Sequence, residues 1–220
     1  MKKLLYKTRM FLAVTMVLVV ILTSCVGLVS AAGFKDGIGC VTCSNEIAPS
    51  YSELYAAVHA AVMDWDWHLA ILNEQYGVDW NMTDTVEDQT DSMIRFLAMN
   101  NQEAEQYSDD LFENAHTIVS DQLIAMMFCF SSNTLVSSDS STWDRVEMIF
   151  LVDNLEKQDY LHDYFDLKQI VNHEIGHALG LADRTDDQGV IMYYNKETCT
   201  AEVATASDLQ NVYFLYSNVG

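Results

Sequence analysis

The chain has 220 residues, half of them apolar and only one a proline, so it can fold as one domain with a sizeable core and is not a disordered chain. Its formal net charge is −21, and such an acidic surface would repel nucleic acids and anionic membranes. The same charge could attract basic substrates, although solubility is the simpler explanation.

The first 32 residues have the layout of a secretory signal, with four basic residues before the apolar run Met10–Leu22 and no acidic residue. The end of this leader has three interpretations. Leu22–Cys25 resembles a bacterial lipobox, which would leave Cys25 lipidated, whereas Ser30–Ala32 suits ordinary cleavage before Gly33. The apolar run could also stay as a transmembrane anchor. We therefore expect an exported protein, secreted or lipid-anchored on the outer side of the cytoplasmic membrane, that meets the membrane only through its leader.

Four cysteines remain beyond the leader: Cys40, Cys43, Cys129 and Cys199. An even number in an oxidising compartment predicts two disulfides, in one of three connectivities. A redox Cys-x-x-Cys or a second metal site at Cys40–Cys43 is the alternative. Neither is supported by a second pair at ligand spacing or by a surrounding βαβ pattern.

Residues 33–49 contain several glycines and indicate an irregular lead-in to a catalytic domain over residues 50–220, with no room for a folded prodomain. Ser50 and Glu53 fit a capping box, and Gly77 fits a helix end. A long helix is therefore predicted between them, with an apolar stripe made of Leu54, Val58, Ala61, Val62, Trp65, Leu69 and Leu72.

The middle of the chain is less informative. Residues 78–100 are ambiguous, because Met93–Leu97 could be a buried strand or part of a helix. Apolar spacing over residues 102–130 favours a helix, and the serine-rich Ser131–Thr142 indicates a surface loop. Val146–Val152 is apolar enough for a strand inside a sheet.

An acidic, aromatic connection follows from Asp153 to Asp166. Its Asp153, Asp159 and Asp163 could hold calcium, but their spacing fits no compact calcium loop, so solvated acids are the simpler interpretation.

Two helices are predicted in the last third of the chain. Asp166 is a suitable N-cap for the first and Gly180 a suitable end, because glycine accepts a positive φ without strain. Thr205 and Asp208 can cap the second. The apolar stripe of the first contains Leu167, Ile170, Val171, Ile175, Ala178 and Leu179.

The first of these helices carries residues suited to a metal ion. His173 and His177 are four residues apart, so both rings can reach one ion. Glu174 is placed where it could hold a metal-bound water, and a turn at Gly180 would offer Asp183 as a third ligand. Three protein ligands leave one position open, which is typical of a catalytic zinc site.

The pattern H-E-x-x-H-x-x-G-x-x-D from His173 to Asp183, followed by Met192 in a tight turn, resembles the metzincin metallopeptidases. The helix and the chain's ending are matrixin-like, and the aspartate as third ligand is snapalysin-like. The resemblance implies an α+β zinc-peptidase domain with a small mixed sheet, a long backing helix, an active-site helix and a short C-terminal helix. It also implies that the two histidines and the aspartate bind one zinc above a floor formed by Met192.

By this resemblance, the chain is an exported zinc-dependent endopeptidase in which Glu174 is the general base for a zinc-bound water. Tyr194 could assist the oxyanion or be an ordinary turn residue. We expect a monomer that acts on proteins or peptides and binds no nucleic acid. Two alternatives remain: a downstream Glu197 or Glu202 as third ligand, or a zinc-stabilised adhesion module without catalysis, which would have no use for Glu174.

Overall fold

The computed structural model describes residues 33–84, 92–112, 119–137 and 142–217. The leader, and with it the predictions for Cys25 and the cleavage site, lies outside the described residues. Parts of the ambiguous, helical and serine-rich segments in the middle of the chain also lie outside them. Within the described part, no helix is both long and apolar enough to cross a membrane.

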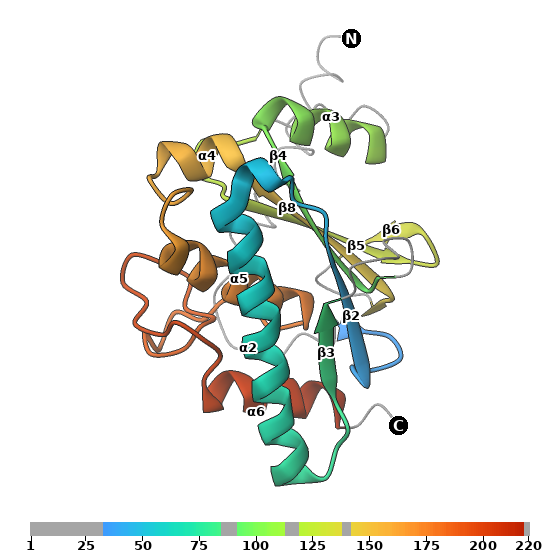
Figure 1. Cartoon of the computed structure of the whole chain (residues 1–220). Coiled ribbons are helices and arrows are strands. Elements are labelled where there is room, and N and C mark those ends of the chain that lie inside the picture. The colour runs from blue at the N-terminus through green and yellow to red at the C-terminus, as the bar shows by residue number, and fades with distance from the viewer. Residues whose placement is uncertain (1–32, 85–91, 113–118, 138–141, 218–220) are drawn as a thin grey trace, which may run out of the picture.

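A six-stranded mixed sheet forms the centre of the fold (Figure 1). Its strands are β2 (Cys40–Asn45), β3 (Asn81–Asp84), β4 (Ile94–Met99), β5 (Ala125–Ser131), β6 (Thr134–Val136) and β8 (Arg145–Leu151). Their order is β3-β2-β4-β8-β5-β6. The four neighbours β3, β2, β4 and β8 pair in parallel, whereas β5 runs antiparallel to both β8 and β6. A separate parallel pair joins β1 (Gly33–Phe34) to β7 (Thr142–Trp143).

The described part of the chain contains five α-helices: α2 (Ser52–Tyr76), α3 (Asn101–Leu111), α4 (Val152–Lys157), α5 (Tyr164–Ala178) and α6 (Ala206–Tyr216). The long α2 packs across α5, and the short α6 lies near the end of both helices (Figure 1). The predicted long backing helix, active-site helix, short C-terminal helix and small mixed sheet are therefore confirmed.

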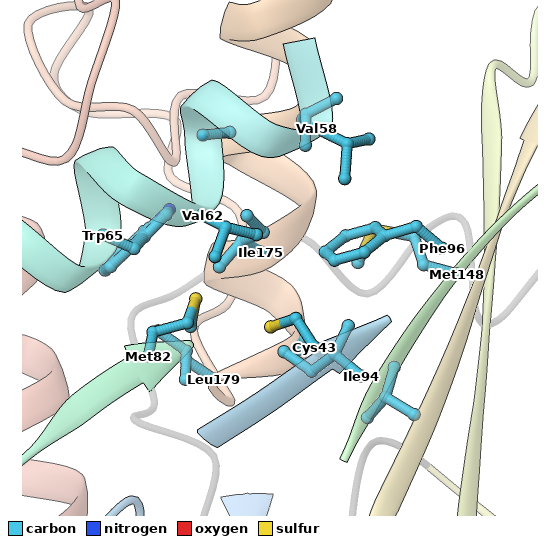
Figure 2. Close-up of a cluster of buried hydrophobic side chains, with 14 of the residues drawn as sticks. Cys43, Val58, Val62, Trp65, Met82, Ile94, Phe96, Met148, Ile175 and Leu179 are labelled. Atoms are coloured by element: carbon cyan, nitrogen blue, oxygen red, sulfur yellow. The ribbon is translucent and has the colours of Figure 1, made fainter. Parts of the chain in front are cut away.

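Successive side chains of a strand point to opposite faces of a sheet, and here the two faces carry different partners. Ile94, Phe96 and Met148 point toward α2 and α5, where they meet Val62 and Ile175 (Figure 2). We call this the α2/α5 face. The opposite, α3 face carries a smaller apolar cluster made of Ala104, Val119, Phe128, Phe130, Ile149 and Leu151.

A buried tryptophan joins the two helices of the α2/α5 face. Trp65 of α2 is fully buried, and its indole Nε1–H donates to the Asn172 carbonyl of α5 over 3.0 Å. Gly77 ends α2 as predicted, with a left-handed φ of 69° and its N–H bonded to the Asn73 carbonyl. Trp65 therefore fixes α2 against α5 one residue before the first histidine of the motif.

The segments before and within the sheet correct several predictions. Residues 33–49 are not irregular, because they supply β1 and the interior strand β2. The helix predicted over residues 102–130 ends at Leu111 and is followed by β5, whose residues are buried on both faces and so lose the period-2 signal of a strand. The ambiguous Met93–Leu97 falls largely in β4.

Smaller corrections concern helix ends and loops. No side chain caps the start of α2, because a 3-10 turn over Pro49–Tyr51 precedes the helix and replaces the predicted capping box. The serine-rich loop contains the short strand β6, and the acidic connection contains α4. Val146–Val152 corresponds to β8, so the prediction of an interior strand is confirmed.

The two predicted disulfides do not form among the four cysteines beyond the leader. Cys40 and Cys43 are three residues apart on β2, so their side chains leave the strand on opposite faces. Cys43 enters the core of the α2/α5 face (Figure 2), where burial raises its thiol pKa, and burial also raises the pKa of Cys129 on β5 to about 12. These two thiols are packing residues.

Candidate metal centre

The helix α5 begins at Asp163, not at the predicted Asp166. The Asp163 carboxylate accepts the backbone N–H groups of residues 165 and 166 over 2.9 and 3.1 Å, which caps the helix. Asp166 instead accepts a bond from Lys196 over 2.6 Å. The predicted apolar stripe is buried, so the opposite side of α5 is left to present the histidines.

The chain reverses direction directly after α5. Gly180 has a φ of 87°, and its N–H donates to the His177 carbonyl over 2.9 Å. Leu181 N–H donates to the Gly176 carbonyl over the same distance. The turn carries Asp183 back to the helix that supplies the two histidines.

Three ligand-type side chains converge there. The Nε2 atoms of His173 and His177 lie 3.2 and 3.4 Å from Oδ1 of Asp183. All three candidate ligand atoms lie within 4.8 Å of one another, and they form the one group of this kind in the part of the chain that the structure describes. Neither Glu197 nor Glu202 belongs to this group.

The other nitrogen of each imidazole is bound to a backbone carbonyl. Nδ1–H of His173 donates to the Ile191 carbonyl, and Nδ1–H of His177 donates to the Leu181 carbonyl, each over 2.8 Å. These bonds fix the two rings, which stand at 88° to each other with their centroids 4.7 Å apart. With Nδ1 holding a proton, Nε2 of each neutral ring has its lone pair available for a metal ion.

The charges at the centre suit a cation. Oδ1 of Asp183 is buried, and among the described residues no hydrogen bond reaches it. Although burial opposes it, the two histidines hold the pKa of Asp183 well below its usual range. Burial would lower the pKa of His177, but without a metal ion Asp183, with a smaller contribution from Glu174, raises it to about 9, so an ion bound at Nε2 would displace that proton. A buried carboxylate oxygen facing two imidazole nitrogens is a donor set that zinc accepts.

Glu174 lies between the two histidines on α5 and is half-buried. Its carboxylate is outside the group of candidate ligands, but its charge acts on His177. A partly exposed carboxylate beside a metal site can exchange protons with a substrate, whereas a ligand carboxylate cannot.

The Met192 turn lies directly under α5. Met192 is buried, and a Cβ added to Gly176 would clash with its sulfur atom. The buried carboxylate of Asp208 accepts the N–H of Ile191 over 3.1 Å, which ties this turn to α6. Arg184, next to Asp183, donates its backbone N–H to the Met192 carbonyl over 2.7 Å. The segment that carries Asp183 and the Met192 turn are therefore held to each other.

The spacing predicts the three candidate ligands that the structure brings together, but it gives no sign of part of their support. Asp208 was predicted only as a helix cap, which it forms with Thr205, and nothing in its spacing indicated a bond to Ile191. The role of Gly176 carried no signal either, since a glycine inside a helix usually indicates weak propensity. Tyr194 is 55% exposed, and no described contact joins it to the candidate ligands.

The calcium site has no structural support in the described residues. Asp163 is the cap of α5, and Asp153 accepts the backbone N–H of Asn101 over 3.0 Å. Asp159 stands in a turn with a φ of 61°. These acids therefore act in helix ends and turns, and they do not gather into a ligand group.

The matrixin family model matches residues 45–217, which is most of the chain. The protein therefore belongs to the matrixin family and is a zinc-dependent peptidase, so its substrates are proteins or peptides. Among curated proteins, no similar sequence was found.

Proposed function

We propose that this protein is an endopeptidase whose single zinc ion is held by His173, His177 and Asp183. The observation that carries the proposal is the approach of two imidazole Nε2 atoms to one buried carboxylate oxygen that lacks a hydrogen-bond donor. A structural zinc site would supply four protein ligands, whereas three leave a position open for catalysis.

Zinc bound there would supply Lewis acidity, which activates water and polarises a peptide carbonyl. Glu174 takes the proton of the attacking water and returns it to the departing amine. The bonds from His173 and His177 to backbone carbonyls hold the rings still during this exchange. Asp183 adds a negative charge that balances part of the ion's charge.

Cleavage is tested by incubating the mature chain with a mixed proteome, with and without a chelator, and mapping the new termini. We expect internal cleavages that the chelator abolishes and that added zinc restores. Glu174→Gln removes the base but leaves the ligands, so it is expected to bind zinc normally and to lose at least about 10²-fold in kcat/KM. A fully active Glu174→Gln enzyme would contradict the assignment of the base.

The ligand set is tested by the zinc content of three matched amide variants, Asp183→Asn, Glu197→Gln and Glu202→Gln. Only the first is expected to lower zinc affinity, because only Asp183 lies in the group of candidate ligands. Loss of zinc in either glutamine variant, with normal zinc in Asp183→Asn, would move the third ligand downstream.

We also propose that the protein is exported, on the basis of its basic and apolar leader. The mass of the mature N-terminus distinguishes the routes. A lipid-modified Cys25 supports an anchored form, a terminus at Gly33 supports secretion, and an intact leader on a membrane-bound chain supports an anchor. An intact leader on a chain in the cytosol would contradict export.

A further inference from the structure

The last carbonyls of α5 are satisfied in two different ways. Backbone N–H groups of residues 179–181 donate to the carbonyls of residues 175–177. The next two carbonyls have side-chain donors from distant parts of the chain. Trp143 Nε1–H of β7 donates to the Ala178 carbonyl over 3.3 Å, and the Tyr216 hydroxyl of α6 donates to the Leu179 carbonyl over 3.1 Å. The end of the active-site helix is thus capped from outside.

The Tyr216 hydroxyl is itself held in place. It accepts the backbone N–H of Phe34 over 2.9 Å, and Tyr216 is only 4% exposed. A Cβ at Gly33 would come within 2.5 Å of the hydroxyl oxygen, so β1 closes over it. Burial raises the pKa of the Tyr216 hydroxyl, which therefore stays protonated and keeps its donor. Both partners of the hydroxyl are backbone groups: the Phe34 N–H of β1 and the Leu179 carbonyl at the end of α5.

The Leu179 carbonyl begins the turn that builds half of the metal centre. Two residues later, the Leu181 carbonyl accepts Nδ1–H of His177, and two residues further on stands Asp183. A change in the direction of the Leu179 peptide would pass through Gly180, which has a positive φ of 87° and a single backbone bond to the His177 carbonyl, and would so move both groups.

We propose that Tyr216 is a positioning residue for the metal centre, which fixes the Leu179 peptide and so aims both the Leu181 carbonyl and Asp183 at the site. This inference rests on the proposed zinc ligands. It assigns to the C-terminal helix a role at the site without contact between Tyr216 and either the metal or the substrate. Residues that orient metal ligands typically affect metal affinity about 10- to 100-fold when they are mutated.

The test is Tyr216→Phe, which keeps the ring and removes both hydrogen bonds. The matched control is Tyr107→Phe, which also removes one hydroxyl that donates a hydrogen bond; this tyrosine is half-buried, and its partner is Glu147 on the α3 face. We expect the zinc dissociation constant, measured by chelator competition, to rise about tenfold in Tyr216→Phe and to stay unchanged in the control. The visible spectrum of the cobalt-substituted protein should shift only in Tyr216→Phe. Equal zinc affinities and equal cobalt spectra in the two variants would overturn the inference.

A double-mutant cycle with Asp183→Asn separates this inference from the proposed function. If Tyr216 acts through Asp183, then Tyr216→Phe should weaken zinc binding less in the Asp183→Asn background than in the native chain. If Asp183→Asn alone leaves zinc affinity unchanged, the proposed ligand set fails. If Asp183→Asn weakens binding and the two changes simply add, only the positioning role fails.

Trp143→Phe provides a second test should Tyr216→Phe not fold. It removes the donor to the neighbouring Ala178 carbonyl and keeps an aromatic ring in the buried site. We expect zinc binding to weaken in the same direction by a smaller factor, because Ala178 lies one residue further from the turn. Unchanged zinc affinity in Trp143→Phe would then count against control of the turn from outside α5.

Discussion

The α2/α5 face and the α3 face alternate residue by residue along the same strands. On β4, Phe96 points to the first face and its neighbour Arg95 to the second. The first face is a continuous apolar core between the sheet and two helices (Figure 2). The second combines a small apolar cluster with buried and half-buried charges. One side of the sheet is therefore packed by a continuous apolar core, and the other combines a smaller apolar cluster with charge pairs.

The charges of the α3 face form one connected network. Glu147 is 2% exposed and accepts bonds from Arg95, Arg145 and Tyr107. Arg95 also forms a bidentate salt bridge with Glu46, in which Nε and Nη2 donate to the two carboxylate oxygens over 2.7 and 2.9 Å. The active-site helix belongs to the other face, where close packing resists movement. We therefore expect catalysis to depend on the apolar face and the charged face to contribute only to stability.

The largest expected effect compares neighbouring residues of β4. Phe96→Ala opens a cavity in the α2/α5 face and should lower the free energy of unfolding by about 4 kcal/mol. Leu97→Ala, at the half-buried next position on the α3 face, should cost about 1–2 kcal/mol. Urea unfolding of the two variants measures both. Equal losses would show that the faces do not differ in packing as described.

The second effect concerns charge on the α3 face. Glu147→Gln keeps the shape of the side chain but leaves Arg95 and Arg145 without their shared buried partner, which should cost about 3 kcal/mol of unfolding free energy. The kcat/KM of the folded fraction should not change, because the network does not touch the candidate ligands. A fall in kcat/KM at full folding would show that the α3 face also supports the site.

The two faces also differ in how far sequence reasoning could describe them. The helices of the α2/α5 face have regular apolar stripes and a left-handed glycine at Gly77, and the metal-ligand pattern from His173 to Asp183 is local in sequence. These features were therefore predictable from spacing. The structure brings His173, His177 and Asp183 together as the spacing required.

The sheet was harder to predict, because its strands are short and β5 is buried on both sides. Periodicity cannot distinguish such runs from helix. The charge network of the α3 face joins Arg95 of β4 and Glu147 of β8 to Glu46, which directly follows β2, and Asp208 reaches Ile191 across 17 residues. Long-range contacts of this kind leave no local signal, so only the fold reveals them.

The third expected effect is a loss of stability at the close contact between Gly176 and Met192 on the apolar face. A Cβ in Gly176→Ala would meet the sulfur of the buried Met192, so either this side chain or the turn under α5 must shift, and close packing favours a shift of the turn. Overpacking of this kind costs about 2 kcal/mol, and the shift should also reduce zinc affinity. Gly39→Ala is the control, because a Cβ at Gly39 meets nothing within 4 Å. Thermal unfolding and chelator competition measure the two consequences. An alanine at residue 176 with native stability and zinc binding would show that Met192 can move freely.

The smallest expected effect is on the pH dependence of stability, through the Glu46–Arg95 pair of the charge network. The hydrogen bonds from Arg95 lower the pKa of Glu46 from its usual 4.5, although burial opposes them. Because the folded pKa is the lower one, the pair stabilises the fold above about pH 4.5, and this contribution is lost as the pH falls through the folded pKa. Glu46→Gln should therefore cost about 0.5 kcal/mol at pH 7, a value kept small by solvent screening, and nothing at the acidic end of the titration.

Urea unfolding of Glu46→Gln at a series of pH values measures this difference, with Glu74→Gln on the exposed side of α2 as the control for loss of one negative charge. A cost that persists unchanged into acid would mean that the amide disturbs packing and that Glu46 does not act through its charge. The kcat/KM of the folded protein at pH 7 should be the same in both variants. Equal activity would leave the charged face with a role in stability and would keep catalysis on the α2/α5 face.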